Sequence, residues 1–161
     1  MKKIVIVLSL IMLPAMILFA DDKKTTRKEK KELREARVKQ IVEEQNYEFG
    51  ARVAMPLNET AQNLTPGFFL KVTKDEITSY LPYFGTSHTP MIGNQDIGIK
   101  FSAKNFEYRL EEVKKGWNII IRVKTDTETY SMILLVSKSG SSSLKVNSTK
   151  SQPISFNGYI E

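Results

Sequence analysis

The residues best suited to chemistry lie in one stretch, residues 79–98, which reads SYLPYFGTSHTPMIGNQDIG. It contains Tyr80, Tyr83, Phe84 and His88, the only histidine of the chain. Aromatic side chains supply large apolar contact surfaces, and an imidazole changes its charge near neutral pH. These residue types in one segment indicate a binding site for a small apolar molecule, a peptide or a partner protein.

Backbone constraints in this stretch hold two aromatic side chains on a tight bend. Pro82 has no backbone N–H to donate and biases Leu81 toward an extended conformation, so the strand that ends at Leu81 stops or reaches a sheet edge there. Gly85 allows a positive φ. Tyr83 and Phe84 lie between them, and they either plug an open end of the sheet or line a ligand site at a barrel mouth. We predict a ligand-binding set of Tyr80, Leu81, Pro82, Tyr83, Phe84, Gly85 and His88.

Catalytic and metal-binding chemistry lack the residue combinations that they require. His88 is joined by no second histidine and no cysteine, so a zinc site of the usual kind lacks ligands. The serines do not form a Gly-x-Ser-x-Gly elbow, and the glycines do not form a phosphate-binding loop. Paired carboxylates for glycoside cleavage would have to come from Glu76, Asp96, Glu107, Glu111 or Glu112. The sequence therefore predicts a protein that is not an enzyme and uses no metal or cofactor.

The start of the chain has the three parts of a secretory signal peptide. A short basic region, Met1-Lys2-Lys3, precedes an apolar run over residues 4–20 that ends in the small residue Ala20. We expect cleavage after Ala20 and export to the periplasm or cell envelope. The run also approaches the ~20 residues of a membrane-spanning helix, so retention as an anchor is the alternative. The chain has no cysteine, which excludes disulfides and a lipid-modified cysteine.

A charged helix is expected within residues 21–46. Thr26 followed by Glu29 has the spacing of a capping box, and Glu35 lies four residues from both Lys31 and Lys39. Residues 23–39 contain nine Lys or Arg and three Glu. Apolar side chains become frequent only near Val38, so the first half should be solvated and the second half docked. A solvated helix is one interpretation, and weak contact of this basic segment with anionic envelope surfaces is the other. Nucleic acid is not an expected partner.

From residue 47 onward the apolar period changes to two, which predicts strands. About eight or nine short strands are separated by short polar turns, and such turns join antiparallel neighbours. The predicted fold class is therefore mainly β with an N-terminal helix. Its domain, residues 47–161, is an antiparallel meander in a barrel-like or strongly curled sheet. Ile120, Ile133 and Leu135 are apolar on the second face of their strands, so we expect residues 117–124 and 129–137 to be covered on both sides.

A family resemblance rests on LPYFG at residues 81–85, GIKF at residues 98–101 and the lysine-rich helix ahead of them. With these motifs in this order, residues 26–161 resemble the domain-of-unknown-function family 4251, exported proteins of Bacteroidetes-type bacteria. The resemblance implies an exported domain of helix and sheet, and it implies no activity or substrate.

Two functional interpretations follow, in addition to the disfavoured enzyme. The preferred one is an exported, non-catalytic domain that binds its ligand or partner at the LPYFG loop. The alternative is a structural or interaction protein of the cell envelope without a ligand pocket.

Overall fold

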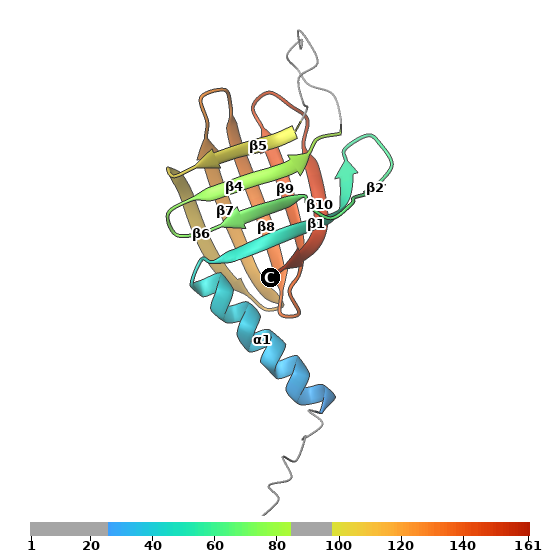
Figure 1. Cartoon of the computed structure of the whole chain (residues 1–161), viewed down its shortest axis with the longest axis vertical. Coiled ribbons are helices and arrows are strands. Elements are labelled where there is room, and N and C mark those ends of the chain that lie inside the picture. Colours follow the sequence, from blue (N-terminus) through green and yellow to red (C-terminus); the bar gives the residue numbers. More distant parts are fainter. Residues whose placement is uncertain (1–25, 85–97) are drawn as a thin grey trace, which may run out of the picture.

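A computed structural model describes residues 26–84 and 98–161 of the chain (Figure 1). The predicted leader, residues 1–20, lies outside the described residues. Among the residues that are described, none forms a helix long and apolar enough to cross a membrane.

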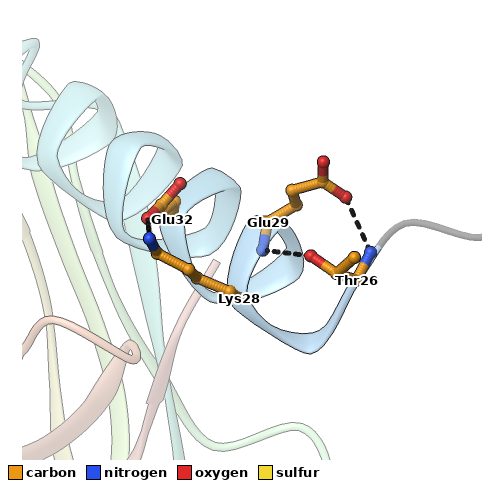
Figure 2. A network of polar contacts seen from close by, with 4 residues as sticks. All are labelled: Thr26, Lys28, Glu29 and Glu32. Carbon is orange, nitrogen blue, oxygen red and sulfur yellow. Dashed lines mark hydrogen bonds and ion pairs between the residues drawn. The ribbon is translucent and has the colours of Figure 1, made fainter.

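Helix α1 spans Arg27–Glu43 and begins at the predicted cap. The Thr26 hydroxyl accepts a hydrogen bond from the Glu29 amide at 3.3 Å, and the Glu29 carboxylate accepts one from the Thr26 amide at 2.7 Å (Figure 2). Lys28 and Glu32 form the adjacent ion pair at 3.9 Å. These contacts satisfy amide groups that have no partner inside the helix, and they fix where the helix begins.

Only the second half of α1 docks on the rest of the protein, as predicted. Val38 and Val42 are buried, whereas Leu33 in the first half is 64% exposed. Glu35 forms an ion pair with Lys138, which lies in a turn of the sheet, and not with the helical lysines that its spacing suggested. The helix is therefore held by an apolar contact near its end and by an ion pair near its middle.

The sheet contains ten strands among the described residues, all in antiparallel pairs. The strands are β1 Tyr47–Pro56, β2 Gln62–Asn63, β3 Phe69–Val72, β4 Ile77–Pro82, β5 Gly98–Ala103, β6 Phe106–Val113, β7 Gly116–Lys124, β8 Thr129–Ser137, β9 Ser141–Ser148 and β10 Ile154–Ile160.

The strand order is β5-β4-β3-β1-β10-β9-β8-β7-β6, with β2 paired to β1. Strands β1, β3, β4 and β5 form one layer and β6 to β9 cross behind it, so the sheet makes a nearly closed barrel with one seam between β5 and β6 (Figure 1). β1 and β10 join the two layers, and β1 has one extra residue between Ala51 and Val53, a β-bulge. The predicted mainly β fold, with a helix ahead of a barrel-like meander, is confirmed.

The interior of the barrel is filled by alternate residues from both layers. On β7 and β8 the inward residues are Trp117, Ile119, Ile121, Val123, Tyr130, Met132, Leu134 and Val136, and each is buried. From the opposite layer, Phe49, Leu70, Ile77 and Leu81 are fully buried against them. The period-two pattern of the sequence thus corresponds to one packed face and one outer face.

One prediction about the outer face is wrong. Strands β7 and β8 are not covered on both sides, because Leu135 is 52% exposed and Ile120 and Ile133 are only half-buried. An apolar residue on the second face of a strand can contact solvent as well as a second layer. The outer surface of the sheet therefore presents apolar side chains.

Candidate functional site

The predicted binding residues divide between the two faces of the sheet. Tyr80 and Leu81 are neighbours on β4, so their side chains point in opposite directions. Leu81 is fully buried in the core, whereas Tyr80 is 43% exposed on the outer face. Pro82 ends β4 opposite Gly98. Gly85 and His88 lie outside the described residues.

Tyr80 belongs to an aromatic cluster on the outer face. Its ring is stacked with those of Phe68 and Phe69, at centroid distances of 5.9 and 6.1 Å. The ammonium of Lys100 lies 4.5 Å from the centre of the Tyr80 ring, a cation–π contact. Tyr80 thus contacts Phe68 just before β3, Phe69 on β3 and Lys100 on β5.

Tyr83 and Phe84 directly follow the end of β4. Both are half-buried and pack against the core. The Tyr83 hydroxyl donates a hydrogen bond to the carbonyl oxygen of Gln152, in the β9–β10 connection, at 3.2 Å. Burial raises the pKa of the Tyr83 phenol. These are the contacts expected of a plug, and ligand binding by these two residues stays a prediction.

A polar cluster that the sequence did not reveal joins the β7–β8 turn to β8 and β9. The Tyr130 hydroxyl donates to one carboxylate oxygen of Glu128 at 2.6 Å, and Ser148 donates to the other. Burial, together with this hydrogen bond to a carboxylate, raises the pKa of Tyr130 well above the ordinary value for a phenol. The Tyr130 ring stacks on Phe101 of β5 at 4.9 Å, across the barrel. The phenol is therefore held neutral, which suits packing better than nucleophilic chemistry.

Metal-ligand clusters of three or more His, Cys, Asp or Glu do not occur within residues 26–84 and 98–161. Of the carboxylates considered for glycoside cleavage, Glu111 bonds Arg109 at 3.0 Å and Asn118 at 3.1 Å on the outer face. Glu107 pairs with Arg122 at 3.6 Å. These carboxylates thus have partners along the outer face of β6 and β7. Asp96 lies outside the described residues.

The outer face of β8, β9 and β10 is hollowed into a groove of about 600 Å³, named here the outer groove. Val113, Leu135 and Tyr159 line it and are 44%, 52% and 56% exposed. They are half of the six exposed large apolar residues in the described part of the chain. Exposed apolar side chains gathered in a concave surface mark a binding site more often than scattered ones do.

Polar groups surround the apolar centre of the outer groove. Its lining includes the serines Ser137, Ser141 and Ser143 and two cationic residues, Arg52 and Lys115. Arg52 is the extra residue of the β1 bulge, which turns its side chain away from the regular alternation. An apolar centre with hydroxyl and cationic neighbours can hold an apolar molecule and orient a polar end of it.

Sequence reasoning missed the outer groove because it treated the second apolar face of β8 as covered. The available signal was the run MILLV at residues 132–136, in which Ile133 and Leu135 interrupt the alternation. Val113 and Tyr159 are far from this run in the sequence, and only the strand order brings them near it.

Two comparisons place the chain among known proteins. The family model described as Domain of unknown function (DUF4251) matches residues 29–160. A crystal structure of a DUF4251 family protein from Bacteroides eggerthii DSM 20697 superimposes with a TM-score of 0.58 and 12% identity, over 80% of this chain and 87% of that chain. At this identity the likeness concerns the fold. Among curated proteins, none matches this chain. The family resemblance noted from the sequence is thus confirmed, while the role of LPYFG as its motif stays a prediction.

Proposed function

Because the chain belongs to the DUF4251 family, whose function is unknown, we propose that it is an exported, non-catalytic domain that binds an apolar ligand in the outer groove. The observation that carries this proposal is the gathering of Val113, Leu135 and Tyr159 around one concavity of about 600 Å³. This volume lies within the ~300–1,000 Å³ of small-molecule sites.

The barrel interior is a less suitable place for the ligand. Its inward side chains are packed against one another, and Phe49, Phe156 and Met132 are among the largest that are fully buried. Binding inside would require these side chains to move apart, which is costly in a close-packed core. The outer groove needs no such opening.

The binding test uses N-phenyl-1-naphthylamine, a neutral apolar dye whose fluorescence rises in apolar surroundings. The protein, expressed with its own leader, should bind the dye saturably. Leu135→Lys should weaken binding roughly tenfold, because it introduces a charge at the centre of the apolar contact. Leu57→Lys is the matched control, since Leu57 is 63% exposed and does not line the groove.

Circular dichroism of both variants shows whether each is folded. Absence of saturable dye binding, or equal loss in the two folded variants, would contradict the proposal. Either result would favour the structural or interaction role in the envelope.

Export is tested separately, by fractionation of the producing cells and the intact mass of the protein. The sequence of the leader supports a mature chain that begins at Asp21 and is found outside the cytoplasm. A cytoplasmic protein that retains residues 1–20 would contradict the exported part of the proposal. A membrane-bound protein that retains residues 1–20 would instead indicate that these residues form an anchor.

A further inference from the structure

Helix α1 extends from one end of the barrel (Figure 1). A second groove, named here the basic groove, lies at that end. It encloses about 700 Å³ between the first half of α1 and two turns of the sheet. The helix contributes Arg27, Lys30, Lys31 and Arg34. The β6–β7 turn contributes Lys114 and Lys115, and the β8–β9 turn contributes Lys138.

The basic groove contains most of the charge imbalance of the protein. Seven cationic side chains line it with one carboxylate, Glu35, which pairs with Lys138. The resulting excess of six positive charges equals the formal net charge of the whole chain, +6. Like charges gathered in one concavity repel each other, so an anion that enters the groove relieves this repulsion.

The two grooves adjoin each other. Lys115 and Ser137 line both of them. A single molecule can therefore place an apolar chain in the outer groove and a charged end in the basic groove without leaving the surface of the protein.

We propose that the outer and basic grooves together bind one anionic amphiphile, with its alkyl chain against Leu135 and Val113 and a phosphate head group among the cations of α1 and the two turns. This inference rests on the proposed function and names the chemical class of its ligand. Arginine and lysine are the side chains that bind phosphate oxygens most strongly. The hydroxyls of Ser137 and Ser139 also line the basic groove, and because they are hydrogen-bonded to each other at 2.9 Å, one of the two can still donate to a ligand.

The same geometry argues for a single dissolved molecule over the surface of a membrane. A helix that lies in a bilayer interface needs an apolar face directed at the lipid. In α1 the apolar Val38 and Val42 are already buried against the barrel, and Leu33 is exposed in a helix half that is otherwise charged. The apolar surface near the basic groove lies instead in the outer groove, which accepts one chain.

The test compares two amphiphiles with the same alkyl chain, dodecyl phosphate and dodecyl maltoside, both below their micelle-forming concentrations. Each is titrated against protein loaded with N-phenyl-1-naphthylamine. Dodecyl phosphate should displace the dye at a concentration at least roughly tenfold lower, and this advantage should shrink as salt is added, because salt screens the attraction.

Two double variants locate the charged end of the ligand. Lys31→Glu with Arg34→Glu should abolish the advantage of dodecyl phosphate and leave the affinity for dodecyl maltoside unchanged. Lys124→Glu with Lys145→Glu changes the net charge equally at exposed positions that line neither groove, and it should retain the advantage.

The failure of this inference is distinguishable from failure of the proposed function. If the dye binds and the two amphiphiles displace it equally, the preference for an anionic head group is contradicted, whereas the apolar binding site in the outer groove is retained. If the dye does not bind, the proposal that the outer groove is a ligand site is contradicted. The protein is also sedimented with phosphatidylglycerol vesicles. If it binds them and monomeric dodecyl phosphate does not release it, the basic groove binds a membrane surface and the single-molecule proposal is overturned.

Discussion

Glu35 of α1 and Lys138 of the β8–β9 turn form an ion pair that joins positions 103 residues apart in the chain. The hydrogen bond and the negative charge of Glu35 raise the pKa of the Lys138 ammonium. The pair ties the middle of α1 to this turn, and both of its members line the basic groove.

Glu35→Gln should loosen the first half of α1 without unfolding the barrel. We expect faster hydrogen exchange over residues 27–34 and an unchanged global melting temperature, because local opening is governed by local contacts. A folded-state pKa above the unfolded value contributes stability at lower pH that is lost as pH rises. The exchange difference between wild type and variant should therefore begin to shrink above about pH 10.5, the ordinary lysine value, and vanish once the pH passes the raised pKa of Lys138. Equal exchange at neutral pH would contradict the role of the pair.

Val42→Ala should destabilise the protein by about 2 kcal/mol, because two buried methyl groups are lost and a cavity remains. Val42 is fully buried at the helix–barrel contact. Urea unfolding measures the free energy of unfolding. Leu33→Ala, on the exposed half of the same helix, is the control and should change it by less than about 0.5 kcal/mol. Similar losses in both variants would mean that the first half of α1 is also docked.

The local features of the helix could be predicted from the sequence, whereas its long-range contact could not. Thr26 and Glu29 are three residues apart, so the capping box follows from spacing alone. Glu35 has lysines four residues away on both sides, and local spacing favoured those partners. Its observed partner, Lys138, comes near only when the sheet closes, and no local pattern contains that information.

For the sheet, too, local features could be predicted from the sequence and long-range contacts could not. Alternation predicted individual strands well, for example residues 129–137 as β8, because each strand has one packed face. It missed β2, which is two polar residues long. It also placed Tyr80 and Leu81 in one site, although neighbours on a strand face opposite sides. Pairing of β1 with β10 had no sequence signal, and the outer groove depends on that pairing.

Gly158 and Gly50 provide a matched test of the β1–β10 contact. A Cβ atom at Gly158 would lie 2.0 Å from the Gly50 carbonyl oxygen, whereas a Cβ atom at Gly50 would meet nothing closer than 4.0 Å. Gly158→Ala should cost about 3 kcal/mol in the free energy of unfolding, since backbone must shift to admit the methyl group. Gly50→Ala should change it by no more than about 1 kcal/mol. A mild effect at Gly158 would show that the two strands are further apart than described.

Ionisation of the tyrosines should couple to unfolding at high pH. Burial raises the pKa of Tyr47 and of Tyr108, whose hydroxyl oxygens lie 3.4 Å apart, and also that of Tyr130. Because these folded-state values exceed the unfolded value of about 10, the stability they contribute is complete below pH 10 and is lost as pH rises further. Ultraviolet absorbance and circular dichroism recorded in one titration should show these phenols ionising together with loss of structure. Full ionisation near pH 10 with native dichroism would contradict their burial.

The central place of β10 in the sheet determines when this chain can finish folding. β10 supplies the hydrogen-bonding partner for both β1 and β9, so the barrel lacks a central strand until residue 160 has been synthesised. A ribosome adds about 5–20 residues per second, which keeps the early strand β1 without its final neighbour for several seconds. A chain that must thread through a translocation channel as an open polypeptide would benefit from this delay, because its fold is completed last at its centre.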